Sequence, residues 1–314
     1  MDNRFKVGNL AADQGQKVQG YLEVPGCSFG LPITLINGEQ KGKTVVITGG
    51  THGGEYPGIE TSIRLAQQLT PDMVVGRVAV IHPVNIPAYH GKMQYIGPDD
   101  GKNLNREYPG KAAGTVTERI AYTISSQLFT QADFYMDLHG GDLHEHLTPF
   151  VFYSCAGTEE NSKVAKSVAE IMGIPYVIRS VSENGAFGCA AAMGVPSILA
   201  EIGGRGLWSE EEVQQYLQAV QNGLRYLGVL SGKTLELGSV TYSEGMVGLN
   251  AEQAGCWYPC VALDTAVKKG EKIGEIKDYF GRVLGEYFAP QDGQVLYIIS
   301  SLAINEGDPI IALG

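Results

Sequence analysis

The sequence predicts an α/β fold with a mixed, mainly parallel sheet, followed by a small all-β region at the C-terminus. Two observations indicate the first part. Short β-branched runs alternate with helical patterns as far as about residue 230, and several runs are apolar enough to be strands buried on both faces. From about residue 234 onward, strand patterns continue without helices. We therefore predict a large α/β domain over 1–233 and an accessory β-sandwich or barrel-sandwich domain over 234–314.

The first elements lead into a glycine-rich turn. Residues 30–36 predict an extended strand that ends in a hairpin-type turn at Asn37-Gly38. A buried strand is expected at 44–48, and the turn that follows it carries His52 and Glu55 between glycines. A helix is then expected from Pro57 to the break at Pro71.

Later elements continue the alternation. Residues 85–110 form a long stretch rich in glycine and proline, and loops of this length inside a compact domain are usually functional or disordered. Thr115 with Glu118, and Ser209 with Glu212, have the form of capping boxes that begin helices. The remaining expected elements are a helix at 160–172 and strands at 77–84, 134–138, 149–154, 175–180 and 196–200.

Composition excludes several classes of protein. The 314 residues are 44% hydrophobic and 18% charged, and no apolar run approaches the roughly 20 residues of a membrane span. A net charge of −11 without a basic run argues against nucleic-acid binding. Five irregularly spaced cysteines suit a reducing compartment, and Met1 to Lys6 lack the apolar segment of a secretory signal. We expect a cytoplasmic enzyme or binding protein.

Imidazoles and carboxylates follow several of the expected strands. His52 and Glu55 come after the first buried strand, His139 follows a later one, and Glu201 closes another. Ligands of open α/β sheets bind outside the carboxyl ends of the strands, so we expect these four side chains at one edge. The alternative is a set of turns in which they face solvent, but chance would scatter them over both edges. The pattern favours a metal site.

Zinc chemistry fits this set. A catalytic zinc ion keeps three protein ligands and one open position, and two histidines plus one glutamate are an established combination. The pKa of its bound water falls to about 7, and the ion polarises a substrate carbonyl. Glu201, not needed as a ligand, suits the transfer of the water's proton to a departing amine.

Four short motifs together resemble those of the succinylglutamate desuccinylase/aspartoacylase family, a branch of the carboxypeptidase A-type zinc hydrolases. They span roughly residues 30–230 and are His52-Gly53-Gly54-Glu55, Asn103-Leu104-Asn105-Arg106, Asp137-Leu138-His139 and Glu201-Ile202-Gly203-Gly204. The resemblance implies a sheet of zinc-carboxypeptidase type and Zn²⁺ on His52, Glu55 and His139. It also implies that Glu201 is the general base and acid and that Asn105 and Arg106 hold a substrate carboxylate.

Two departures from the family pattern stand out. Asn103 replaces the aspartate that would orient a zinc-bound histidine. The arginine that relatives place upstream in the same loop, where it stabilises an oxyanion, is missing from 89–94. Either Lys92 substitutes for it or the metal acts alone.

Other candidate residues rank lower. His144 and His146 flank Glu145 and could indicate a second metal, but a polar loop is the favoured interpretation. His82 is expected to be a hydrogen-bonded core histidine, and Arg205 either contacts substrate or is an ordinary loop residue. Two thiols four residues apart at Cys256 and Cys260 are a weak metal pattern.

The C-terminal region contains two similar segments. Residues 267–274 resemble 304–311, with an Ala-Pro-x-Asp-Gly turn at 289–293 between them. This arrangement resembles lipoyl and biotinyl carrier domains, but the turn lacks the lysine that would carry the prosthetic group. We expect a structural or access-controlling β domain, which desuccinylase relatives also carry.

Together these features predict a zinc-dependent amidohydrolase (a deacylase) that cleaves the amide bond of an N-acyl amino acid or similar small amide carrying a carboxylate. A metallocarboxypeptidase acting on short peptides uses the same groups and is the alternative. A non-catalytic zinc-binding regulatory protein is a further alternative, against which the presence of Glu201 argues. Neither a nucleic acid nor a membrane is expected as a partner, and a homo-oligomer is possible.

Overall fold

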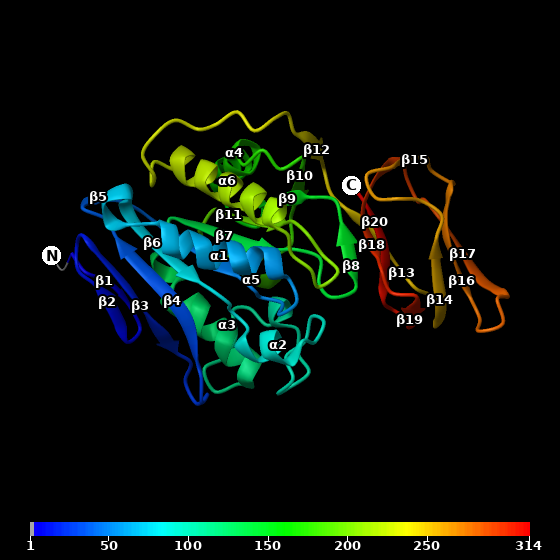
Figure 1. Ribbon diagram of the computed structural model, residues 1–314, viewed down its shortest axis with the longest axis horizontal. Coiled ribbons are helices and arrows are strands. Elements are labelled where there is room, and N and C mark those ends of the chain that lie inside the picture. The colour runs from blue at the N-terminus through cyan, green and yellow to red at the C-terminus, as the bar shows by residue number, and fades with distance from the viewer. Residues whose placement is uncertain (1–2) are drawn as a thin grey trace.

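A nine-stranded, mixed sheet forms the centre of the molecule, in a computed structural model that describes residues 3–314 (Figure 1). Five of its neighbouring pairs are parallel and three are antiparallel, which confirms the predicted fold class. The strands, in spatial order, are β12 (Thr241–Ser243), β10 (Tyr176–Ser180), β9 (Phe150–Ser154), β11 (Ser197–Glu201), β7 (Phe134–His139), β5 (Gln40–Gly49), β6 (Val75–Ile81), β4 (Gly30–Asn37) and β3 (Gln16–Glu23).

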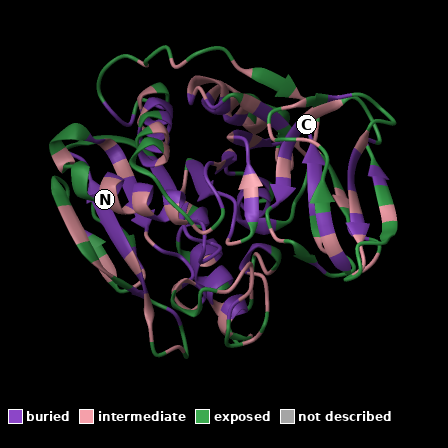
Figure 2. Ribbon diagram, turned by 45° about the vertical axis from the view of Figure 1, so that its right-hand side comes forward, coloured by how far each residue is buried: buried purple, intermediate pink, exposed green. Residues whose placement is uncertain are grey.

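Helices cover both faces of this sheet. One face carries α1 (Tyr56–Gln68), α4 (Glu159–Ile171) and α6 (Glu210–Tyr226), and the other carries α3 (Val116–Gln127) and α5 (Gly185–Ala192). Alternate residues of one strand therefore belong to different cores: Val45 and Ile47 pack toward α1, and Val46 packs toward the opposite face. Figure 2 shows the buried residues running along the central strands. Burial on both faces explains the apolar runs in the sequence.

Both predicted capping boxes are present. The backbone N–H of Thr115 donates to the Glu118 carboxylate at 2.8 Å, at the start of α3. At the start of α6, the backbone N–H of Glu212 donates to the Ser209 hydroxyl at 3.2 Å and the carboxylate of Glu212 accepts the Ser209 N–H at 2.8 Å. Each box satisfies backbone donors that the first helical turn would leave unpaired.

The hairpin predicted after residues 30–36 is wrong. Strands β4 and β5 do not pair, because β6 lies between them and bonds to both. Gly38 makes the short link close to the start of β6: a Cβ atom there would lie 2.0 Å from the carbonyl oxygen of Val74. The hairpin of this region joins β3 to β4 instead.

Several elements were not expected from the sequence. They are β1 (Phe5–Val7), β2 (Leu10–Ala12), β3, α2 (Ile86–Gly91), α5, β8 (Glu145–Leu147) and the 3₁₀ turns at Pro71–Met73, Leu104–Arg106 and Phe129–Gln131. Among residues 3–314, no helix has both the length and the apolar content that a membrane crossing requires.

The C-terminal strands form two antiparallel sheets around a separate apolar core that includes Trp257, Ile276 and Val295. One sheet contains β13 (Val247–Asn250), β15 (Ala266–Val267), β18 (Gly293–Ile299) and β20 (Pro309–Leu313), and the other contains β14 (Gly255–Pro259), β16 (Lys272–Lys277), β17 (Val283–Phe288) and β19 (Ala303–Ile304).

These sheets lie at one end of the molecule (orange to red in Figure 1), and they are joined to the larger part. Strand β8 leaves the larger part and pairs with β18. Strand β12 bonds to β10 at the edge of the large sheet. The domain boundary at 233/234 stays a prediction.

Candidate active site

The carboxyl ends of three neighbouring parallel strands bring the predicted residues together. His52 and Glu55 lie in the turn after β5, His139 is the last residue of β7, and Glu201 is the last residue of β11. His139 and Glu201 are register partners, so their side chains share one face of the sheet on strands about 4.8 Å apart.

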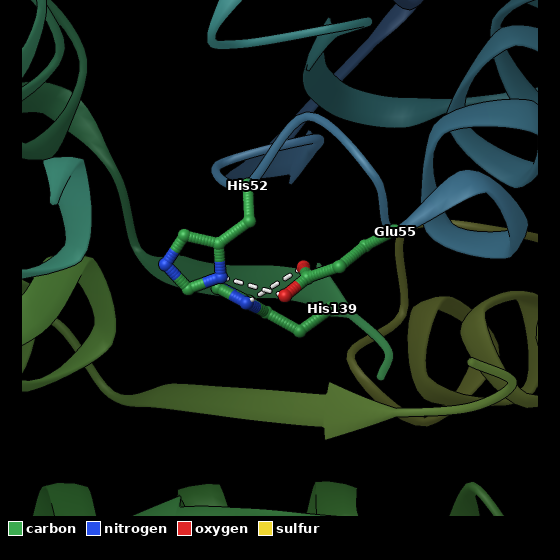
Figure 3. A group of neighbouring side chains, drawn as sticks. All are labelled: His52, Glu55 and His139. Carbon is green, nitrogen blue, oxygen red and sulfur yellow. Dashed lines mark hydrogen bonds and ion pairs between the residues drawn. The ribbon is translucent and has the colours of Figure 1, made fainter. Parts of the chain in front are cut away.

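Three of these side chains converge on one point (Figure 3). The Nδ1 atom of His52 lies 2.6 Å from Oε1 of Glu55, and Nδ1 of His139 lies 2.9 Å from Oε2 of the same carboxylate. One ligand atom from each residue lies within 4.8 Å of the others, and all three residues are buried. Within residues 3–314 they form the single group of three potential metal ligands.

Outer partners orient the two imidazoles. Nε2 of His52 lies 3.0 Å from Oδ1 of Asn103, and Nε2 of His139 lies 3.1 Å from Oδ2 of Asp137. An acceptor beside each Nε2 favours a proton on that nitrogen, so each Nδ1 could offer its lone pair to a metal once the proton that it shares with the Glu55 carboxylate has left. Asp137 is itself fixed by the hydroxyls of Thr48 and Thr51, at 2.8 and 3.3 Å.

The charges of this group depend on one another. Burial raises the pKa of the Glu55 carboxyl, but His139 and His52 outweigh burial and hold that pKa at about 2. Burial lowers the pKa of both histidines, but the Glu55 carboxylate outweighs it and raises both, that of His139 well above its usual value with help from Asp137. The buried carboxylate therefore draws positive charge to this point, either protons or a cation.

The donor set fits a metal ion, and zinc in particular. Two imidazole nitrogens and a carboxylate are ligands that zinc accepts. In residues 3–314, Oε2 of Glu55 is also a buried oxygen without a hydrogen-bond donor, although it lies within ion-pair distance of His139. A cation at this point would satisfy that oxygen. The three residues could therefore hold a metal.

Glu201 lies beside this group but outside it. Its Oε2 atom is buried, and no group of residues 3–314 donates a hydrogen bond to it. Burial raises the pKa of Glu201 well above the usual value, His139 opposes that effect, and the carboxylates of Glu55 and Glu145 add to it. A carboxyl with a raised pKa takes up a proton more readily, which suits a general base and acid.

A cavity of about 470 Å³ opens onto these residues. The large domain supplies most of its wall, and the C-terminal strands supply the rest through Met246, Gly248, Tyr297, Pro309, Ile311 and Ala312. Apolar side chains on the other side include Leu147, Phe150, Phe152, Phe187 and Leu199. The C-terminal region thus forms part of the wall of the site.

Asn105 and Arg106 also line this cavity. Asn105 is buried, and its Oδ1 accepts the backbone N–H of Ala186 in α5 at 3.0 Å. Arg106 is exposed, and its Nη1 donates to the Asn105 carbonyl at 3.0 Å. Nearby, Lys102 forms ion pairs with Glu107 and Glu118 at 3.2 and 3.1 Å, which ties the loop to α3.

The lower-ranked candidates lie elsewhere. Lys92 lines a separate surface pocket with Tyr89 and Trp208, so it does not occupy the place of the missing arginine. Arg205 and His144 are exposed, and neither lines the cavity. His146 is half-buried and does not join a metal-binding group in the described part of the chain. The half-buried His82 lies 3.0 Å from the hydroxyl of Thr34, as a hydrogen-bonded core histidine would.

Three cavity residues were missed by the analysis of the sequence: Tyr95, Glu145 and Tyr297. The hydroxyl of Tyr95 donates to Glu145, and the Tyr95 ring packs edge-on against His52 with centroids 5.7 Å apart. The available signal was strand alternation, which places Glu145 on the same face as Leu147 and the two histidines on the other face.

Known proteins resemble this chain in sequence and in structure. The model of the succinylglutamate desuccinylase/aspartoacylase catalytic domain matches residues 41–227. The N-alpha-acetyl-L-2,4-diaminobutyric acid deacetylase of Halomonas elongata is 29% identical over 297 residues, which are 90% of this chain and 85% of that protein.

Two solved structures have the same fold over nearly the whole chain. A succinylglutamate desuccinylase/aspartoacylase from Rhodobacter sphaeroides has a TM-score of 0.84 and 26% identity, covering 95% of each chain. The product-bound ectoine utilization protein of Ruegeria pomeroyi has a TM-score of 0.89 and 25% identity, covering 100% of this chain and 99% of the other.

Proposed function

The chain belongs to the succinylglutamate desuccinylase/aspartoacylase family, and on that premise we propose that it is a zinc-dependent deacylase that hydrolyses the amide bond of an N-acyl amino acid. The observation that carries the proposal is the convergence of two Nδ1 atoms on the Glu55 carboxylate, with Glu201 on the neighbouring strand. The Halomonas relative, named for removing an acetyl group from an amino acid's α-nitrogen, supports this substrate class.

In this proposal His52, Glu55 and His139 hold the zinc ion. When bound, zinc supplies the Lewis acidity that makes water nucleophilic near pH 7 and polarises an amide carbonyl. Asn103 and Asp137 hold the two imidazole rings so that their Nδ1 atoms stay directed at the ion.

Glu201 moves the proton. Its buried oxygen has no donor among residues 3–314, so it is free to accept a proton from the attacking water and deliver it to the leaving amine nitrogen. Without that delivery, the amine would leave as a poor, anionic group. Burial, the largest cause of the raised pKa of Glu201, favours the protonated form needed in the second half of the reaction.

Arg106 and Asn105 bind the carboxylate of the substrate. A guanidinium forms two parallel hydrogen bonds with a carboxylate, and such charge-assisted bonds are about twice as strong as neutral ones. Arg106 lines the cavity, and its hydrogen bond to the Asn105 carbonyl uses one nitrogen, Nη1. Asn105, anchored to α5, fixes the backbone from which Arg106 extends.

A metallocarboxypeptidase would use the same groups, and the shape of the cavity supports the deacylase over it. The C-terminal strands close one side of the cavity, and its volume of about 470 Å³ suits a small amide better than a peptide that must extend outward. The cytoplasmic location and a homo-oligomeric state stay predictions.

A hydrolysis assay on a mixed panel tests the proposal. Zinc-loaded and chelator-treated protein would each be incubated with N-acetyl, N-succinyl and N-formyl amino acids and with dipeptides. We expect zinc-dependent release of the free amino acid from at least one N-acyl compound and much slower cleavage of dipeptides. Preferential cleavage of dipeptides would favour the carboxypeptidase, and a panel left intact by zinc-loaded protein would refute both.

A further inference from the structure

Glu145 is a buried carboxylate in the wall of the cavity, and the reaction proposed above does not use it. Glu145 is only 8% exposed, and it lines the same cavity as His52, Glu55, His139, Glu201 and Arg106. It does not belong to the group of potential metal ligands found within residues 3–314. A second metal site therefore does not explain it.

The hydrogen-bond partners of Glu145 are neutral. One oxygen accepts the hydroxyl of Tyr95, the other accepts the backbone N–H of Asp142 at 2.7 Å, and the Tyr297 hydroxyl beside the carboxylate also stabilises its charge. In the described chain, no lysine or arginine is among the main groups that act on its charge, whereas the Glu55 carboxylate repels it. Burying a carboxylate without a cation is costly, and neutral donors offset only part of that cost.

The backbone holds Glu145 firmly in this position. It begins β8, which pairs with β18 of the C-terminal region, and the N–H of Arg205 donates to its carbonyl at 2.7 Å. Gly204 packs so closely on that carbonyl that an added Cβ would lie 2.4 Å from the oxygen. Tyr95, which donates to the carboxylate, has a left-handed backbone with φ of 60°. Such strain in a non-glycine residue is typical of functional sites.

We propose that Glu145 is a specificity residue that binds a positively charged side-chain group, such as a primary ammonium, on the amino-acid part of the substrate. The inference rests on the proposed deacylase function and deepens it. An ammonium would supply the missing counter-charge, and the remaining lone pairs of the carboxylate can accept its N–H groups. A diamino acid would then find a counter-charge for its carboxylate at Arg106 and for its side chain at Glu145, in one cavity.

A purely structural role is the competing explanation, since Glu145 joins Tyr95 to the loop at Asp142. The two explanations differ in one respect. A structural residue affects all substrates alike, whereas a counter-charge affects only substrates that carry the cation.

The test compares two substrates of equal length, Nα-acetyl-L-2,4-diaminobutyrate and Nα-acetyl-L-norvaline, which differ by an ammonium in place of a methyl group. Wild-type protein should prefer the first. Glu145→Gln keeps the size and the acceptor oxygen, and we expect it to lower kcat/KM for the diamino substrate by about 30-fold or more. For the norvaline substrate, kcat/KM should change less than about threefold. Glu236→Gln, a change of one exposed charge outside the cavity, is the matched control and should alter neither substrate.

A second variant and a binding measurement keep the proposal falsifiable if turnover fails. Tyr95→Phe removes the hydroxyl that holds the carboxylate. It should lower kcat/KM by less than Glu145→Gln does, and again mainly for the diamino substrate. Calorimetric binding of free 2,4-diaminobutyrate and norvaline to each protein reports the preference without hydrolysis. Suppose that wild-type protein cleaves Nα-acetyl-L-norvaline. If Glu145→Gln then lowers kcat/KM equally for both substrates, or for neither, the inference falls and the deacylase stands. If neither substrate is cleaved and the wild type binds both free amino acids alike, the inference fails, and the wider panel of N-acyl compounds decides the deacylase separately.

Discussion

Nε2 of His52 lies 3.0 Å from the amide oxygen of Asn103, and the same oxygen accepts the backbone N–H of Asn105 at 2.8 Å. The second bond fixes which end of the amide faces the ring, so Nε2 of His52 carries a proton and donates it to Asn103. An asparagine thus orients the first histidine with a neutral acceptor, whereas His139 has a carboxylate partner in Asp137. Asn103 links the metal-binding group to the loop that carries Arg106.

Replacing Asn103 should weaken metal binding. Asn103→Ala removes the acceptor for His52, and loss of such an outer partner typically costs about 10–100-fold in metal affinity. Asn103→Asp keeps an acceptor at the same place and should retain or raise the affinity. Competition with a chromogenic zinc chelator measures both variants. An alanine variant with wild-type affinity would mean that Asn103 does not orient the ring.

Zinc should raise the thermal stability of the protein. A ligand that binds only the folded state stabilises it by an amount that grows with concentration, about 2.7 kcal/mol at 100 times Kd. We expect the melting temperature of chelator-treated protein to rise with added zinc, and His139→Ala to remove the increase. Differential scanning calorimetry with magnesium as the control ion checks this. A rise that persists in His139→Ala would place the metal elsewhere.

The meeting of His52, Glu55, His139 and Glu201 could be predicted from the sequence because β5, β7 and β11 are parallel, so their carboxyl ends lie at one edge. Family membership, predicted from four motifs, is confirmed by the match over residues 41–227. Glu145 and Tyr297 could not be found in this way. They meet through the pairing of β8 with β18, about 150 residues away in the sequence, and no local pattern encodes that register.

The errors in the fold also have physical causes. The Asn37-Gly38 pair suggested a hairpin, but the register of β6 between β4 and β5 decides the topology. Helix α5 was missed because its residues are small or apolar on every side, and nearly all of them are buried. A helix buried all round lacks the 3.6-residue alternation on which sequence analysis depends.

Glu118 should make the stability of the folded protein depend on pH below about pH 4.3. Hydrogen bonds from Lys111, the backbone of Thr115 and Lys102 hold its pKa at about 2 in the folded protein. The unfolded value is about 4.3, so the stabilisation is present above pH 4.3 and is lost as the pH falls toward 2. Glu118→Gln should therefore lower the melting temperature at pH 7, and the difference should shrink below pH 4. A difference that does not change with pH would contradict this.

Arg106 should govern affinity for substrates with a carboxylate. Arg106→Ala removes the guanidinium, so we expect KM to rise strongly for an N-acyl amino acid and far less for its carboxamide. Arg106→Lys keeps the charge but not the paired hydrogen bonds and should give an intermediate value. Steady-state kinetics on the acid and amide pair measure this. Equal losses on the two substrates would mean that Arg106 does not contact the carboxylate.

Glu201 should govern turnover. Glu201→Gln keeps the size and one acceptor oxygen but cannot take the proton of the attacking water, and loss of a general base typically costs about 10²–10⁴-fold in kcat. KM should change much less, because the proton transfer stabilises the transition state and not the bound substrate. Zinc content, measured by elemental analysis, should stay at the wild-type level, since Glu201 lies outside the metal-binding group. His52→Ala is the matched control and should lose zinc and activity together. A Glu201→Gln protein that keeps zinc and near-normal kcat would show that this carboxylate does not carry the proton, and the metal site would then be structural.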